Sequence, residues 1–156
     1  MITIFGLGFV GLTTALGFSE KGLKVYGFEI NNNKRNILSN GQIPFHEPYL
    51  KDMLQKHSRN GNFILVEDLK IALKSSEIAI ICVGTPSEKH GKVNISQIKD
   101  AIDLIILNSL EKNIAICIKS TIPPSTTQNE IYPYILKKSK LDPKSIRLAN
   151  NPEFLR

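Results

Sequence analysis

Short apolar runs alternate along the chain with longer segments whose apolar residues recur at helical spacing. The runs predict buried strands at Ile2–Phe5 and at residues 24–28, 63–66, 78–83, 113–119 and 146–149. The helical spacing predicts six helices. The first follows Gly11, the second spans Asn32–Ser39, and the third runs from Pro48 to about His57. The fourth runs from Glu67 to Lys74, the fifth from Asn94 or Ser96 to about Leu110, and the sixth begins at Ser125. Strands that alternate with helices indicate a parallel sheet. We therefore expect an α/β fold, a Rossmann-like, doubly wound, mainly parallel sheet with helices on both faces, in a single domain of residues 1–156.

Glycines follow the first predicted strand at the spacing G-x-G-x-x-G and lead into the first predicted helix. Gly6 permits a sharp turn, Gly8 lets a pyrophosphate approach the backbone, and Gly11 allows the helix to pack close to the strand. The N-terminus of the helix adds free N–H groups and a positive dipole end. Glycine turns also occur for packing alone, so the strand–turn–helix context carries the prediction of a dinucleotide site.

Glu29 ends the second predicted strand, about 20 residues beyond the glycines, where an acidic side chain meets the ribose hydroxyls of a dinucleotide. The plainer alternative is a carboxylate at the start of the following helix. A free carboxylate here would repel a 2′-phosphate, so we expect NAD rather than NADP. Lys34 and Arg35 lie close by in the sequence and weaken that preference.

Further polar or glycine-containing segments directly follow the later predicted strands. They are Gly84, Thr85 and Pro86, then Ser120 and Thr121, and finally residues 151–153. In an open parallel sheet the ligand crevice lies outside the carboxyl ends of the strands. We therefore expect these segments to meet the glycine turn and Glu29 at one edge of the sheet.

The chain carries a formal charge of +6. Its densest basic cluster, Lys137, Lys138, Lys140 and Lys144, falls in a polar connection without interleaved aromatic residues, so we expect no nucleic-acid partner. The positive charge suits an anionic ligand such as a dinucleotide or a nucleotide sugar. No apolar run reaches the roughly 18 residues of a membrane span, and the N-terminus does not resemble a signal peptide. We expect a cytoplasmic protein with no membrane partner.

Two cysteines and two of the histidines raise the question of a disulfide or a metal site. Cys82 and Cys117 lie in apolar, strand-like runs, which favours reduced core thiols over a disulfide. His46 and His57 flank a predicted helix without a further acidic or thiol ligand at metal spacing. We interpret both as surface or capping histidines and expect no metal.

Five segments together resemble a known family: GLGFVG at the glycine turn, residues 41–48, CVGTP, KSTIPPSTT and NPEFLR. In this order and spacing they are similar to the N-terminal domain of the UDP-glucose/GDP-mannose dehydrogenases, and the resemblance covers the whole chain. CVGTP and NPEFLR are its most specific parts. The chain departs from the family pattern at Glu29, where the family usually has Asp, and at Ser125, where it usually has Gly.

The resemblance implies oxidation of the C6 hydroxymethyl group of a nucleotide sugar to a carboxylate, with two NAD per turnover and a cysteine-bound thiohemiacetal. It implies cofactor-binding roles for Gly6, Gly8, Phe9, Val10 and Gly11 at the pyrophosphate, Glu29 and Lys34 on the ribose side, and Val83, Gly84, Thr85, Pro86, Ser120 and Thr121 on the nicotinamide side. It implies catalysis by Glu153, which acts with a water molecule and Thr121. The sugar would contact the backbone of Glu153, Phe154, Leu155 and Arg156.

The rest of the family's machinery, namely its nucleophilic cysteine, a lysine, an asparagine, the dimer helix and the nucleotide-sugar domain, lies beyond residue 156. The resemblance therefore implies a truncated cofactor domain that binds NAD but is inactive alone, from an enzyme that is a homodimer at full length. UDP-glucose 6-dehydrogenase is the first interpretation, GDP-mannose 6-dehydrogenase the alternative, and an enzyme for N-acetylated amino sugars ranks third. The rivals are another type of dehydrogenase, a non-catalytic NAD-binding module and a purely structural domain.

Overall fold

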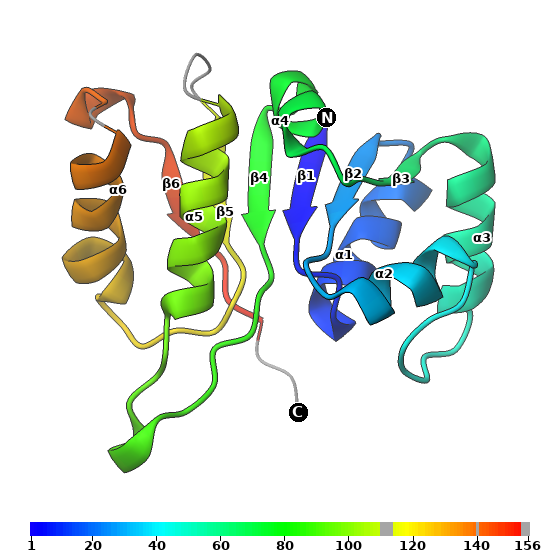
Figure 1. The fold of residues 1–156 in the computed structure, drawn as a ribbon, viewed down its shortest axis with the longest axis horizontal. Coiled ribbons are helices and arrows are strands. Elements are labelled where there is room, and N and C mark those ends of the chain that lie inside the picture. The colour runs from blue at the N-terminus through cyan, green and yellow to red at the C-terminus, as the bar shows by residue number, and fades with distance from the viewer. Residues whose placement is uncertain (110–113, 140, 154–156) are drawn as a thin grey trace.

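The computed structural model describes residues 1–109, 114–139 and 141–153. These residues form a sheet of six parallel strands in the order β3-β2-β1-β4-β5-β6 (Figure 1). The strands are Ile2–Phe5 (β1), Val25–Phe28 (β2), Phe63–Leu65 (β3), Ile78–Ile81 (β4), Ala115–Ile118 (β5) and Leu148–Asn150 (β6). The strand order reverses between β1 and β4. Ligands of open α/β sheets bind outside the carboxyl ends of the strands at such a point.

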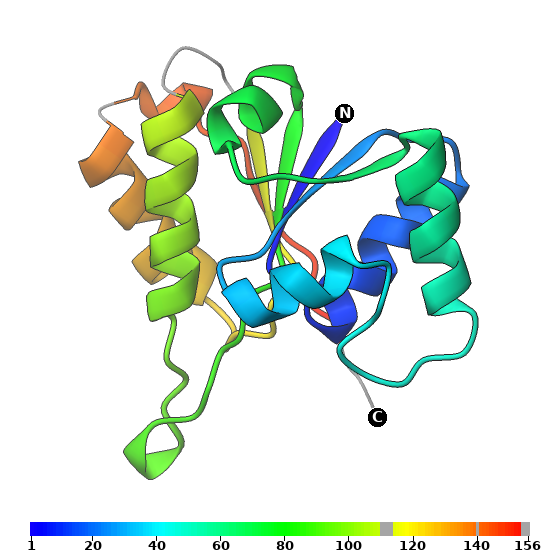
Figure 2. The ribbon, with the colours of Figure 1, turned by 45° about the vertical axis from the view of Figure 1, so that its right-hand side comes forward.

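Helices cover both faces of this sheet, as Figure 2 shows. They are Phe9–Glu20 (α1), Asn32–Ser39 (α2), Leu50–Asn60 (α3), Leu69–Ser75 (α4), Ser96–Ser109 (α5) and Tyr132–Ser139 (α6). Shorter helical turns span Lys89–Gly91, Thr127–Ile131 and Pro143–Ser145. Within the described residues, no helix is both long and apolar enough to cross a membrane.

Alternate side chains of the strands pack into hydrophobic clusters on opposite faces of the sheet. Ile4 and Ile80 pack in the cluster that α1, α2 and α3 complete, whereas Phe5 and Ile81 pack in the cluster beneath α4, α5 and α6. Because successive side chains of a strand point to opposite faces, a strand between two helical layers is apolar at most of its positions. The predicted doubly wound α/β fold is confirmed, and its unbroken apolar runs follow from this burial.

The predicted elements differ from the observed ones mainly at their ends. Helix α2 has the predicted bounds. Helix α3 begins at Leu50 rather than at Pro48, because Tyr49 has a φ of 64° and so cannot continue a right-handed helix. The last strand, expected at residues 146–149, spans Leu148–Asn150.

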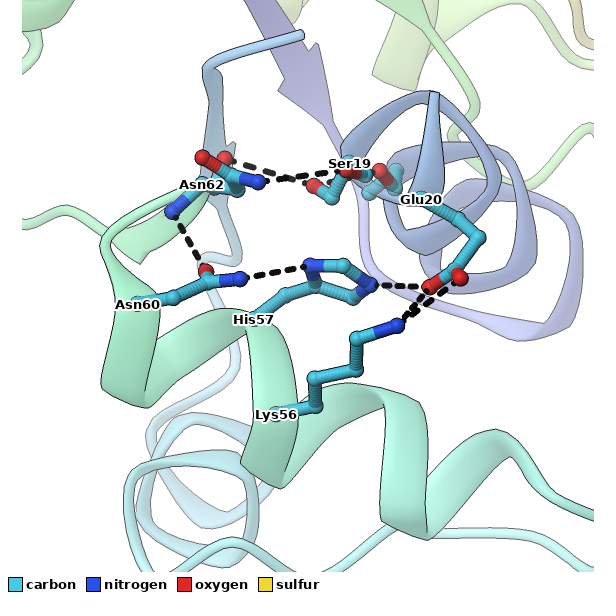
Figure 3. A network of polar contacts seen from close by, with 7 residues as sticks. Ser19, Glu20, Lys56, His57, Asn60 and Asn62 are labelled. Atoms are coloured by element: carbon cyan, nitrogen blue, oxygen red, sulfur yellow. Dashed lines mark hydrogen bonds and ion pairs between the residues drawn. The ribbon is translucent and has the colours of Figure 1, made fainter. Parts of the chain in front are cut away.

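The interpretation of His57 as a surface or capping histidine is wrong. Its side chain is 2% exposed, and its Nε2 lies 2.6 Å from Oε2 of Glu20 at the end of α1 (Figure 3). Lys56 pairs with the same carboxylate at 2.8 Å, and the side-chain amide of Asn60 contacts Nδ1 of His57. His57 therefore ties α3 to the end of α1 that lies away from the glycine turn.

The basic cluster was expected in a polar connection, but part of it lies in a helix. Lys137 and Lys138 lie in the last turn of α6, and Lys138 pairs with Asp103 of α5 at 3.0 Å. Lys144 belongs to the short turn Pro143–Ser145. The expectations for Leu110, Asn113 and Lys140 lie outside the described residues.

Candidate functional site

The glycine turn between β1 and α1 lies at the centre of the candidate site, and Gly6 and Gly11 have the geometry that the spacing predicts. Gly6 has a φ of 85°, and a Cβ there would lie 2.9 Å from the carbonyl oxygen of Cys82. A Cβ on Gly11 would lie 1.8 Å from the carbonyl oxygen of Gly6, so the turn closes only without side chains. Gly8 differs, because a Cβ there would meet no atom within 4 Å. Gly6 and Gly11 are thus required by the fold, whereas Gly8 borders open space.

Helix α1 presents its N-terminus at this open space. Gly8 occupies the N-cap position and provides no side-chain hydrogen bond to the first turn of the helix. The first N–H groups of an α-helix have no partner within the helix, and together with the helix dipole they attract an anion. The turn therefore offers backbone N–H groups to a phosphate without a side chain in the way.

Glu29 lies beside the glycine turn at the end of β2 and is 5% exposed. Its Oε2 accepts a hydrogen bond from the backbone N–H of Leu7 at 3.0 Å, and its Oε1 accepts one from the backbone N–H of Asn31 at 2.9 Å. The carboxylate therefore joins the glycine turn to the start of α2. It also lines the adjoining cleft, where its remaining lone pairs can accept hydrogen bonds from hydroxyl groups of a ligand.

A cleft at this edge has a volume of about 590 Å³. It is lined by these residues of the predicted cofactor set: Gly6, Gly8, Phe9, Val10, Glu29, Lys34, Val83 and Gly84. Sequence reasoning missed its far wall, where Gln97, Asp100, Ala101 and Leu104 line the cleft from α5. Their spacing places them on one face of a helix, which was the available signal.

A second cleft of about 330 Å³ adjoins the first and shares Val10, Cys82, Val83 and Gly84 with it. It brings together the remaining predicted residues Thr85, Ser120, Thr121 and Glu153. Gly11 and Pro86 line neither of these two clefts. Phe154, Leu155 and Arg156 lie outside the described residues.

Hydrogen bonds and an ion pair hold the segments around the second cleft together. The hydroxyl of Thr121 donates to the carbonyl oxygen of Glu153 at 2.8 Å, and that of Thr85 donates to the carbonyl oxygen of Thr121 at 3.0 Å. Ser120 donates to the carbonyl oxygen of Val83 at 2.6 Å, so its hydroxyl fixes the ends of β4 and β5. These bonds fix Thr121 and Glu153 on the same wall.

Lys119 is a further residue of this wall that sequence reasoning missed. Its side chain is 14% exposed, and its Nζ lies 2.7 Å from Oε2 of Glu153 and 3.3 Å from Oδ1 of Asn151. The signal was its place directly after a strand, immediately before Ser120. The ammonium group of Lys119 therefore faces the Glu153 carboxylate and holds it on this wall of the cleft.

The two cysteines are free thiols, as predicted. Cys82 lines both clefts, and burial raises the pKa of its thiol to about 12, although the nearby Lys119 opposes the rise. Burial also raises the pKa of Cys117. Since the thiolate is the nucleophilic form of cysteine, this rise disfavours the nucleophilic form of Cys82, whose side chain lines the walls of the two clefts.

Comparison with known proteins agrees with this geometry. Residues 1–156 match the NAD binding domain of the UDP-glucose/GDP-mannose dehydrogenase family. The chain is 35% identical over 161 residues to the GDP-mannose 6-dehydrogenase of Pseudomonas syringae pv. syringae, a match that covers 99% of this chain and 36% of the relative. It is 33% identical over 155 residues to a UDP-glucose 6-dehydrogenase of Bacillus subtilis strain 168, with 99% of this chain and 34% of the relative covered.

A solved structure shows the same arrangement. The crystal structure of a ternary complex of GDP-mannose dehydrogenase from Pseudomonas aeruginosa matches with a TM-score of 0.91 and 34% identity, over 99% of this chain and 36% of that chain. The chain thus spans about a third of the length of the relatives that it matches. The chain therefore belongs to the UDP-glucose/GDP-mannose dehydrogenase family, and residues 1–156 correspond to the NAD-binding domain of that family.

Proposed function

We propose that this chain is the cofactor-binding part of a nucleotide-sugar 6-dehydrogenase, which oxidises the C6 hydroxymethyl group of its substrate to a carboxylate. The observation that carries the proposal is the continuity of the two clefts through Val10, Cys82, Val83 and Gly84. A dinucleotide laid along them has its ribose end at Glu29 and its reactive end towards Glu153. NAD, when bound, supplies the acceptor for the hydride of the substrate.

The cofactor fits the residues of the larger cleft. We assign the pyrophosphate to the N-terminus of α1 and to the backbone of Gly6, Gly8, Phe9, Val10 and Gly11, with Gly11 acting through the close packing of the turn. We assign the adenosine ribose to Glu29, whose two oxygens are already fixed by backbone N–H groups. Lys34 lines the same cleft and offers a positive charge to the anionic cofactor.

The smaller cleft is proposed as the nicotinamide and reaction end. Val83, Gly84, Thr85, Pro86 and Ser120 shape this end through the backbone and the bonds described above. The hydroxyl of Thr121 donates a hydrogen bond to the carbonyl oxygen of Glu153, so its oxygen can still accept a hydrogen bond from a water molecule.

Glu153 is proposed as the base towards that water molecule in the hydrolytic half of the reaction. Its ion pair with Lys119 at 2.7 Å and the hydrogen bond from Thr121 to its carbonyl oxygen hold Glu153 at the edge of this cleft, where its carboxylate can meet the water molecule. We propose that Glu153 and the following residues Phe154, Leu155 and Arg156 bind the sugar through their backbone.

UDP-glucose remains the first proposed substrate, on the strength of the sequence resemblance. GDP-mannose is the second candidate, because the relative from Pseudomonas syringae, which is named for it, is as similar to this chain as the UDP-glucose relative. The full-length enzyme is proposed to be a homodimer.

The proposed cofactor site is tested by substituting Gly8, where an added methyl group enters open space. We expect Gly8→Ala to fold normally and to weaken NAD binding by more than about tenfold, because the methyl group stands where the pyrophosphate must approach. Gly17→Ala is the matched control, since Gly17 lies on the same helix and also has nothing within 4 Å of an added Cβ. Isothermal titration calorimetry measures both variants; equal NAD affinity of Gly8→Ala and Gly17→Ala contradicts the assignment.

A further inference from the structure

One face of α5 borders the larger cleft and carries two polar side chains, Gln97 and Asp100, that have no role in the site proposed above. Gln97, Asp100, Ala101 and Leu104 follow one another at spacings of three, one and three residues, which places them on a single helical face. Ile98 and Ile102, which lie between them in the sequence, are buried in the core. The direction of this face is therefore fixed by the packing of α5.

The surroundings of this face suit a flat aromatic base. Phe28 and Ile30 come from the end of β2, and Ala101 and Leu104 come from α5; all four line the cleft. Phe28 is held in place by an edge-on contact with Phe5, with ring centroids 5.6 Å apart. Apolar walls favour a planar base by burial, but they do not distinguish one purine from another.

Asp100 can distinguish one purine base from another. Its side chain has no hydrogen bond or ion pair to any described residue, in contrast to Asp103, which accepts a hydrogen bond from Tyr134 at 2.8 Å and pairs with Lys138 at 3.0 Å. An ionised carboxylate only accepts hydrogen bonds. Gln97 cannot make the same distinction, because its amide group offers both a donor and an acceptor.

We propose that Asp100 is a specificity-determining residue that accepts a hydrogen bond from the 6-amino group of the cofactor's adenine, an inference that rests on the proposed NAD site. Adenine presents an N–H donor at this position, whereas hypoxanthine presents a carbonyl oxygen. A carboxylate attracts the first and repels the second. The site thereby selects an adenine dinucleotide over one that carries a 6-oxopurine.

The test compares the binding of NAD and of nicotinamide hypoxanthine dinucleotide by isothermal titration calorimetry. We expect the unchanged chain to bind NAD about tenfold more tightly, the order of magnitude for one hydrogen bond to a charged group that is open to solvent. Asp100→Asn should reduce this ratio to about twofold or less, because the amide can turn its donor towards the carbonyl oxygen. Asp52→Asn on α3 removes the same charge away from the cleft and should keep the original ratio.

The outcomes separate the two proposals. Saturable binding of both dinucleotides with equal affinity, or a ratio that Asp100→Asn leaves unchanged, overturns the role of Asp100 and leaves the proposed cofactor site standing. Binding of neither dinucleotide overturns the cofactor site and the role of Asp100 together.

Discussion

Replacement of Glu29 by Gln should destabilise the chain by about 3 kcal/mol, and the size of the effect follows from two contacts. The carboxylate accepts one backbone N–H on each oxygen, from Leu7 at 3.0 Å and from Asn31 at 2.9 Å, and it is 5% exposed. Glutamine keeps one acceptor oxygen, so one N–H keeps a weaker, uncharged bond and the other faces an NH₂ group. Losing a hydrogen bond to a charged group costs about 1.5–3 kcal/mol, and weakening the second adds about 1 kcal/mol.

Urea unfolding measures this change directly. With a slope of about 2 kcal/mol per molar urea, the midpoint of Glu29→Gln should fall by about 1.5 M. Glu88→Gln is the matched control, because Glu88 is exposed on the loop that carries the turn Lys89–Gly91, and its midpoint should change little. Equal midpoints for Glu29→Gln and Glu88→Gln would refute the claim that this carboxylate fastens the glycine turn to β2.

Two further predictions concern stability away from the clefts. Tyr49→Gly should raise the free energy of unfolding by about 0.5–1 kcal/mol, because Tyr49 has a φ of 64° and relief of that strain exceeds the backbone entropy cost of glycine. The control Tyr49→Ala keeps a Cβ and should not stabilise the chain. A similar gain in both variants contradicts the strain argument. Hydrogen bonds from Lys56 and then His57 hold the pKa of Glu20 below its ordinary value, so the stabilisation by this group is full above pH 4.5 and is lost as the pH falls through the lowered pKa. Urea midpoints measured down the pH scale should therefore fall less steeply for Glu20→Gln than for the unchanged chain, and parallel curves contradict this linkage.

The fold could be predicted from the sequence because strands that are buried on both faces consist mainly of apolar residues. Strand β4 is apolar at every position and strand β1 at every position except Thr3, so their apolar runs are visible without a structure. Because all strands are parallel, the segments after β1, β2, β4, β5 and β6 lie at one edge of the sheet, and this explains why most of the predicted site residues meet there.

Other features depend on contacts between residues that are distant in the sequence, and their own patterns do not indicate them. His57 is buried because Glu20, 37 positions earlier, meets its ring, and a lone histidine on a polar helix gives no sign of this. The two backbone bonds of Glu29 likewise depend on the packing of β2 against the glycine turn. Ser125, where the family usually has Gly, adopts a φ of 67°, so the departure from the pattern is accommodated in the left-handed conformation that favours glycine.

The most direct test of the central claim, that this chain binds NAD through the glycine turn and Glu29, is a calorimetric titration with NAD and, separately, with NADP. We predict saturable binding of NAD and at least about tenfold weaker binding of NADP, because the buried carboxylate is fixed by two N–H groups and cannot turn away from a 2′-phosphate. Equal or tighter binding of NADP would contradict the role of Glu29 and move the assignment to Lys34 and Arg35. Binding of neither would contradict the claim itself.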